Sequence, residues 1–484
     1  MENQADLVAA EDLLLFVNAA ITSTGQREFR SQADEQRMSL AFLHAYVLGN
    51  YRELYAATLA LDINHHNAAL IVRRLLETAS EATPEQRHTE GRLIAGRLAV
   101  LPPQRVYRLF REVRRAGVNN RRTRAIMRDW LAARPDPALD AVKYRSGVKA
   151  VARHAHLRLD RDFGLREPGL GELGPFLFAP HTRRTGFTTP LFESWRRAHY
   201  TQSALYELPY TVAEGFAARH GIDRGVFLER IAPRLTRLER LRLQESARAH
   251  RADAVAADLA AMPLTRLASY VLALPLDDRV RRREELTAAL RAAALRTAGP
   301  RAGSWGRVAA VLDDSFSAFG SAQKRRRPLA VALGCHFLLE ALAGELIPLW
   351  LSGRTDALLT YPMGPTPLGT RVLDALEHRP DRLVIVSDGW DNAPPGLAGE
   401  ALRIWRTRLD PRGRTSVVHL NPVYDAEDFD VRRLAREVPT VGVRDAEDVP
   451  ALVELAQFAE GRSRAAELWA HVDTRVRRFL EVER

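Results

Sequence analysis

The hydrophobic pattern of the chain changes near residue 300, and this change constrains the fold more than any other feature. Residues 5 to about 295 give one helical pattern after another, with apolar side chains three and four positions apart. After residue 305, short apolar runs alternate with amphipathic helices, as in α/β domains. A chain of 484 residues is also too long for a single core. We therefore expect a multidomain protein: an all-α helical-repeat domain over residues 1–300, then an α/β doubly wound domain over residues 301–484.

The first of these domains is predicted to consist of paired helices separated by turns that contain Pro, Gly or Asn. Stacked helical hairpins of this kind build a solenoid or a closed ring, although no fixed period assigns a repeat class. Residues 160–190 are rich in Gly and Pro and predict a surface loop, and residues 297–306 predict the joint between the domains.

The second domain is predicted to alternate strands and helices. The expected strands are residues 308–312, a strand near Ile347, residues 382–387, and the runs TSVVHL and VPTVGV. The expected helices are residues 324–345, 368–378, 396–408, 449–460 and 463–484.

Oxygen-bearing side chains follow two of these strands. Asp313, Ser315 and Ser317 form D-x-S-x-S in AVLDDSFSAFG, Thr366 lies in MGPTPLGT, and Asp388 lies in LVIVSDGWDN. Side chains at the carboxyl ends of parallel strands enter the crevice where ligands bind. Hydroxyls bind Mg²⁺ directly, while the aspartates supply charge or hold waters and leave a position for an outside anion. The pattern predicts a site for Mg²⁺ or Mn²⁺ that binds a partner's carboxylate or phosphate.

A plainer interpretation stays open for the same residues. Ser315 and Ser317 could cap the helix that starts near Ala322, and Asp388 could end its strand in a turn.

These three segments resemble the von Willebrand factor A domain and its metal-ion-dependent adhesion site. The resemblance covers roughly residues 305–460, and all five motif positions are filled. Many members have Gly where Phe316 stands, so the loop is expected to be bulkier here.

Positive charge is concentrated in the first 300 residues. Residues 301–484 contain 25 Lys and Arg against 26 Asp and Glu, whereas residues 1–300 contain 46 against 34. Residues 101–150 alone hold 13 basic and 4 acidic side chains. This clustering predicts a surface that contacts a polyanion. The candidate residues in its arginine run are Arg111, Arg114, Arg115, Arg121, Arg122 and Arg124.

Arginine abundance by itself is weak support for this prediction. Only three of the 71 cations are lysines, namely Lys143, Lys149 and Lys324, as a GC-rich genome would produce on ordinary solvated helix faces. Acids are nearly missing from the arginine run, however, whereas opposite charges usually alternate on a solvated helix.

The helical half permits a second comparison. The stretch DAVKYRSGVKAVARHAHL, residues 140–157, resembles part of the TROVE module of Ro autoantigen proteins, a ring of helical repeats followed by an A domain. The resemblance implies binding of noncoding RNA, either misfolded or Y RNA-like, and a ribonucleoprotein. By position it marks Lys143, Arg145, Lys149, Arg153 and His156 as phosphate contacts. His154 and His156 could equally be neutral core or surface histidines.

We therefore expect a Ro-like RNA-binding protein whose A domain docks a protein partner, such as a nuclease or an RNA ligase. The alternative is a scaffold that docks on a MoxR-type AAA+ ATPase without binding RNA. An enzyme is not expected, because no Walker loop, nucleophile elbow or zinc hydrolase signature is present.

Two further features bear on the location of the protein. The most apolar segment, residues 328–351, contains His336, Glu340 and Glu345, which are costly in lipid, so a buried helix and strand are expected instead of a membrane span. Cys335 is the only cysteine, and the first residues carry acids before their apolar stretch, unlike a secretory signal. A cytoplasmic protein without a membrane partner is expected.

Overall fold

The computed structural model describes residues 4–159, 171–179, 186–436, 438–453 and 465–481. The chain forms two compact units. One unit, here called the α/β unit, contains residues 1–67 and 259–478, and the other, the helical unit, contains residues 68–258 and 479–484. The compact units divide the chain after residues 67, 258 and 478. The domain boundary near residue 300 stays a prediction.

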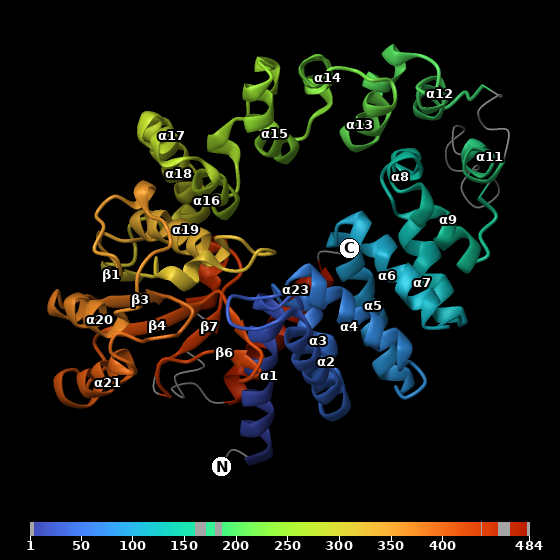
Figure 1. Cartoon of the computed structure of the whole chain (residues 1–484). Helices are drawn as coiled ribbons and strands as arrows, with labels where there is room; N and C mark the ends of the chain where they lie inside the picture. Colours follow the sequence, from blue (N-terminus) through green and yellow to red (C-terminus); the bar gives the residue numbers. More distant parts are fainter. Residues whose placement is uncertain (1–3, 160–170, 180–185, 437, 454–464, 482–484) are drawn as a thin grey trace. The chain divides into compact units, whose positions relative to one another are not determined.

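The α/β unit is built on a five-stranded parallel sheet with the strand order β2-β1-β3-β4-β7 (Figure 1). Its strands are β1 (Arg307–Leu312), β2 (Glu345–Trp350), β3 (Arg382–Val386), β4 (Ser416–Asn421) and β7 (Thr440–Gly442). A separate antiparallel pair joins β5 (Tyr424–Asp425) to β6 (Asp430–Val431). The predicted strands at 308–312 and 382–387 are confirmed.

Helices cover both faces of the sheet. Ala309, Val311 and Ile385 belong to a core cluster with α20 (Leu368–Glu377) and α21 (Leu397–Ile404), which continues as a π-helical turn over Trp405–Leu409. Side chains alternate along a strand, so β1 also has side chains on the second face of the sheet. Helix α19 (Arg327–Leu342) covers that face and contacts β1 and β2.

Helix α19 is also covered on its outer side, by α16 (Leu264–Ala273) and α18 (Arg283–Ala298). A helix packed on both sides is apolar all round, which explains the hydrophobicity of residues 328–342. No helix in the described ranges is both long enough and apolar enough to cross a bilayer.

Helices from the beginning of the chain complete the α/β unit. Helix α1 (Gln4–Thr22) packs against β6 and β7, and the side chain of Asn18 accepts a bond from Gly442 N at 2.9 Å and donates to Asp430 at 3.0 Å. The other helices assigned to this unit are α2 (Ala33–Asn50), α3 (Arg52–Ala57), α17 (Leu276–Arg281) and most of α23 (Ala465–Glu481).

The helical unit contains consecutive helices whose starts follow from local capping. Thr83 and Thr236 form capping boxes at α5 and α15, and Asn120 caps α7. The helices are α4 (His65–Glu77, which begins in the α/β unit), α5 (Pro84–Val100), α6 (Pro103–Arg115), α7 (Arg121–Ala132), α8 (Pro137–Lys143), α9 (Arg145–His154), α11 (Leu173–Phe178), α12 (Pro190–Arg197), α13 (Tyr210–Arg219), α14 (Arg224–Ile231) and α15 (Arg237–Ala249).

Two predicted segments differ from the structure or lie partly outside the described ranges. The loop predicted over residues 160–190 contains a helix, α11, because Leu173, Phe176 and Leu177 are buried; residues 160–170 and 180–185 of that loop lie outside the described ranges. Most of the helix predicted over residues 449–460 also lies outside them, whereas α23 confirms the final helix.

Candidate functional site

The two predicted metal-binding aspartates flank the point where the strand order of the sheet reverses. The chain runs from β1 outward to β2 and then returns to β3 on the other side of β1. Crevices that bind ligands in open parallel sheets open at this point, beyond the carboxyl ends of the strands. Asp313 follows β1 and Asp388 follows β3, and the N–H of Asp313 donates to Val386 O at 3.0 Å. The two side chains are only 5% and 6% exposed.

The two predicted serines lie in the same place. The N–H of Ser315 donates to Asp313 Oδ1 at 2.8 Å, and the Oγ atoms of Ser315 and Ser317 are 3.2 Å apart. The Ser317 hydroxyl also interacts with the Asp388 carboxylate. The fold thus brings together both carboxylates and both serine hydroxyls of the predicted centre.

Thr366 reaches this edge through a loop that is bonded to both neighbouring loops. Its N–H donates to Asn392 Oδ1 at 2.9 Å, and Asn392 N–H donates back to Thr366 O at 3.3 Å. Two residues earlier, Gly364 O accepts the N–H of Phe316 at 3.1 Å. The loop that carries Thr366 is therefore bonded to the serine loop and to the Asp388 loop, and the Thr366 side chain is buried.

The surroundings of the two aspartates disfavour their charged forms. Burial and the nearby Asp388 carboxylate raise the pKa of Asp313, and burial raises the pKa of Asp388, against the Ser317 hydroxyl, the Trp390 N–H and the Arg30 and Arg432 charges. Within the described ranges neither carboxylate has an ion pair, and no group of three or more His, Cys, Asp or Glu forms a metal cluster. A divalent ion here would be held by Asp313, Ser315, Ser317, Thr366 and Asp388.

The neighbouring Asp314 has a different role. Its carboxylate accepts the N–H and the hydroxyl of Ser352, the latter at 2.5 Å, just after β2. Burial raises the pKa of Asp314, and the Ser352 bonds oppose that rise. Asp314 therefore ties the β1 and β2 loops together and is not part of the candidate centre.

The helix-cap interpretation of the serines is wrong. Helix α19 begins at Arg327, and neither Ser315 nor Ser317 bonds to its first turn. The hydroxyl near that start that accepts a backbone bond belongs to Ser321, which receives the N–H of Lys324 at 3.1 Å. Phe316, at the position where a glycine is expected, is 61% exposed and packs edge-on against Phe29.

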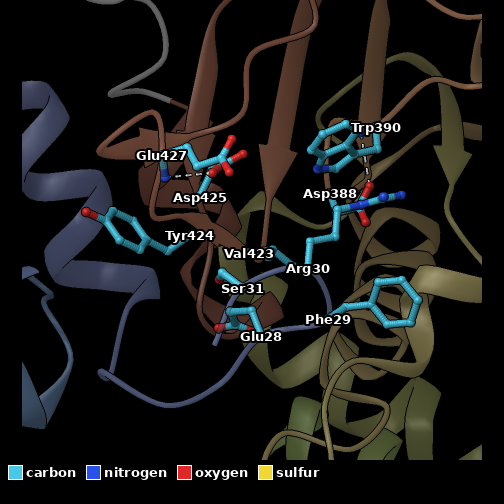
Figure 2. A pocket seen from close by; sticks show the side chains of 10 residues that line it. All are labelled: Glu28, Phe29, Arg30, Ser31, Asp388, Trp390, Val423, Tyr424, Asp425 and Glu427. Carbon is cyan, nitrogen blue, oxygen red and sulfur yellow. Dashed lines mark hydrogen bonds between the residues drawn. The ribbon is translucent and has the colours of Figure 1, made fainter. Parts of the chain in front are cut away.

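Sequence reasoning missed the pocket beside Asp388, which has a volume of about 260 Å³ (Figure 2). Arg30, from the loop between α1 and α2, lies with its guanidinium carbon 4.1 Å from the ring centre of Trp390. Nothing local in the sequence links residue 30 to residue 388. The lining residues are Glu28, Phe29, Arg30, Ser31, Asp388, Trp390, Val423, Tyr424, Asp425 and Glu427.

The predicted RNA-binding residues lie in the helical unit, and several of them are near His154. Helix α9 packs against both α6 and α7, and His154 Nε2 lies 3.0 Å from Val118 O in the α6–α7 loop. Burial lowers the pKa of His154, against the bond to Val118 O, and the nearby charges of Arg114, His156 and Arg124 lower it further. The seven residues here called the basic surface are Arg111, Arg114, Arg115, Arg121, Arg124, Arg153 and His156.

Two predicted contacts are engaged inside the fold instead. Arg145 donates to Phe176 O at 2.6 Å and stacks on the rings of Phe176 and Trp195. Arg122 pairs with the buried Glu90 at 3.4 Å. Both arginines therefore fasten helices to one another.

The two predicted lysines lie near aromatic rings. Lys143 Nζ is 5.8 Å from the ring centre of Tyr144. Lys149 Nζ is 5.8 Å from the ring centre of Phe178, which Arg153 also approaches, at 5.3 Å. Burial and the charges of Arg145 and Arg153 lower the pKa of Lys149.

No protein-family model and no curated protein matches this sequence. The function therefore has to be inferred from the chemistry of these two regions.

Proposed function

We propose that the protein binds structured or misfolded noncoding RNA through the basic surface of its helical unit. The observation that carries this proposal is the meeting of α9 with α6 and α7 at the Val118–His154 contact, where the charges of Arg114 and Arg124 act on His154. In the described part of the chain, no carboxylate forms an ion pair with Arg114, Arg121 or Arg124. Unpaired guanidinium groups that share one region attract phosphates.

This surface favours RNA contacts that depend on charge and shape. Guanidinium groups bind phosphate oxygens and also stack on unpaired bases. Affinity would then fall steeply with salt, because each neutralised phosphate releases counterions. The resemblance to the TROVE module supports the same ligand class.

A charge reversal tests RNA binding. We expect Arg114→Glu, Arg121→Glu and Arg124→Glu together to weaken binding of a hairpin RNA with a single-stranded 3′ end at least tenfold at low salt. The slope of log affinity against log salt should flatten by about 0.7–0.9 per lost phosphate contact. Filter binding over a salt series measures both quantities.

The matched control reverses Arg230, Arg234 and Arg237, which are exposed on the same unit outside the basic surface. Equal loss of affinity in both triple variants would show that net charge alone attracts the RNA. Unchanged binding after the first reversal would contradict the proposal.

We further propose that the α/β unit docks a protein partner through a divalent cation held by Asp313, Ser315, Ser317, Thr366 and Asp388. The support is the pair of buried carboxylates with raised pKa values beside two serine hydroxyls. The resemblance to the metal-ion-dependent adhesion site agrees with this arrangement. If RNA binding fails while metal binding holds, the adaptor function favoured by this centre, for example on a MoxR-type ATPase, is the better assignment.

Metal binding is tested by calorimetry and by the electron paramagnetic resonance of Mn²⁺. We expect Asp313→Ala to abolish Mn²⁺ binding, because the variant removes one of two carboxylate charges. The control Asp374→Ala removes a half-buried, Arg371-paired carboxylate from α20 and should leave Mn²⁺ binding unchanged. Mn²⁺ binding by Asp313→Ala equal to that of the wild type would exclude this centre.

A further inference from the structure

The pocket next to the candidate metal centre is completed by a loop from the other end of the sequence. Residues 28–31 form one side of the pocket, and Asp388 and Trp390 form another (Figure 2). All of these residues belong to the α/β unit.

This loop is firmly attached to the unit. The buried Glu28 carboxylate pairs with Lys324, and the N–H of Arg27 donates to Gln323 Oε1 at 3.1 Å. At the other end of the loop, Gln36 Nε2 donates to Ser31 Oγ at 2.6 Å and to Tyr424 O at 3.0 Å. The segment that carries Arg30 is therefore fixed by bonds on both sides.

Arg30 differs from the other cation of this region. Arg432 also stacks on Trp390, at 3.7 Å, but it pairs with Asp425 and Asp428 at 3.7 and 3.8 Å. Among the described residues no carboxylate forms an ion pair with Arg30, although its charge acts on Asp388. The Arg30 guanidinium is thus held beside the candidate centre with its donors available to an anion.

We propose that Arg30 is a second anchor for the anion that binds at the metal centre, and that this anion is the carboxylate of an acidic side chain on a partner protein. The inference rests on the proposed metal-dependent docking function. A planar guanidinium donates two parallel bonds to a carboxylate, and its stacking on Trp390 fixes the direction of those donors.

The surroundings favour a protein acid over an RNA phosphate. Glu427 and Asp425 line the far part of the pocket and would repel the repeated charges of RNA. Exposed apolar side chains lie on the loops of the centre, including Phe316 and Met363, which offer contact area to a peptide. One carboxylate flanked by apolar groups matches this combination of charges and surfaces.

The test uses the full-length protein loaded with Mn²⁺ and a capped Gly-Asp-Gly peptide as the probe. Binding near Mn²⁺ broadens the peptide's nuclear magnetic resonance signals, so weak affinities can be measured. We expect Arg30→Gln to weaken peptide binding about tenfold while Mn²⁺ affinity stays the same or rises, since a positive charge near the metal is lost. Arg30→Lys should restore part of the affinity.

The matched control is Arg27→Gln, an exposed arginine of the same loop that does not line the pocket. It should bind Mn²⁺ and peptide as the wild type does. Peptide affinity unchanged in Arg30→Gln, or equally reduced in Arg27→Gln, would overturn the role of Arg30 while leaving the metal function intact. A wild-type protein that binds no Mn²⁺ would overturn both proposals.

An RNA oligonucleotide added as a competitor separates the two anion sources. We expect no displacement of the peptide. Displacement that depends on Arg30 would show that the site takes nucleic-acid phosphate, and would overturn the assignment to a protein acid.

Discussion

His419 is a fully buried side chain of β4, which pairs with β3, the strand that precedes Asp388. Its Nε2 lies 3.0 Å from Ser387 Oγ and its Nδ1 lies 3.2 Å from Thr440 Oγ1. Burial lowers the pKa of His419 to about 4, against the bond to the Ser387 backbone, which raises it. The fold therefore holds this ring in its neutral form.

Because protonation of His419 is disfavoured only in the folded state, the ring should destabilise the α/β unit in acid. The stability gained from the neutral His419 ring is fully present above about pH 6.5. It is lost as the pH falls toward 4, which lowers the free energy of unfolding by about 3 kcal/mol. We expect His419→Asn to lose less stability than the wild type between pH 6.5 and 4. Hydrogen exchange of β3 and β4 across this range measures the difference, and parallel curves for the two proteins would contradict it.

Residue type alone does not identify a phosphate contact. Arg145 and Arg114 come from the same basic stretch of sequence, yet Arg145 lies against the rings of Phe176 and Trp195, while Arg114 remains exposed. Which guanidinium is engaged depends on neighbours that are distant in sequence.

The crossing of α6 and α9 sets the position of the basic surface. Gly147 lies at this crossing, and a Cβ atom there would be 2.7 Å from Cβ and Cγ of Tyr107. Tyr107 is itself held, since its hydroxyl donates to Asp140 at 2.9 Å, and Asp140 pairs with Arg134 at 2.6 Å. Tyr107 therefore has little room to move if a side chain is added at residue 147.

Gly147→Ala should therefore push α9 away from α6 and destabilise the helical unit by about 1–3 kcal/mol. The control Gly91→Ala, on α5, has no neighbour within 4 Å of the added Cβ. That change should stabilise the unit by about 0.5–1 kcal/mol through helix propensity. Urea unfolding of both variants, followed by hydrogen exchange in α6 and α9, tests the pair. A neutral Gly147→Ala would show that the crossing tolerates the added methyl group.

The elements were largely predictable because their signals are local. The short apolar runs at 308–312 and 382–387 became β1 and β3, and the predicted helix at 368–378 appears as α20. Helix α11 was missed because Gly and Pro around it suggest a loop, whereas its three buried apolar side chains become apparent only through packing.

The first helix of the chain, α1, packs against the last two strands, β6 and β7. Asn18 joins them, because its amide bonds to Gly442 N–H and to the Asp430 carboxylate, and all three groups are buried. Both partners would stay buried and lose a bond if the amide were removed.

We expect Asn18→Ala to destabilise the α/β unit by about 2–4 kcal/mol, since two buried polar groups lose a partner. The control Asn50→Ala removes an exposed amide that bonds to Tyr46 O, and should change stability by about 0.5 kcal/mol or less. Hydrogen exchange in β4 and β7 reports the effect. Equal exchange in the two variants would show that α1 does not support the sheet.

Local sequence accounts for the alternation of strands and helices after residue 300, the oxygen donors at the ends of β1 and β3, and the excess of arginine in residues 101–150. These properties follow from the order of neighbouring residues, which controls periodicity, capping and local charge. Long-range packing, in contrast, joins the first 67 residues to the unit that holds the sheet, brings Arg30 beside Asp388, and engages Arg122 and Arg145 inside the fold. Such contacts join residues far apart in the chain, and they depend on which buried surfaces fit together, which no short stretch of sequence specifies.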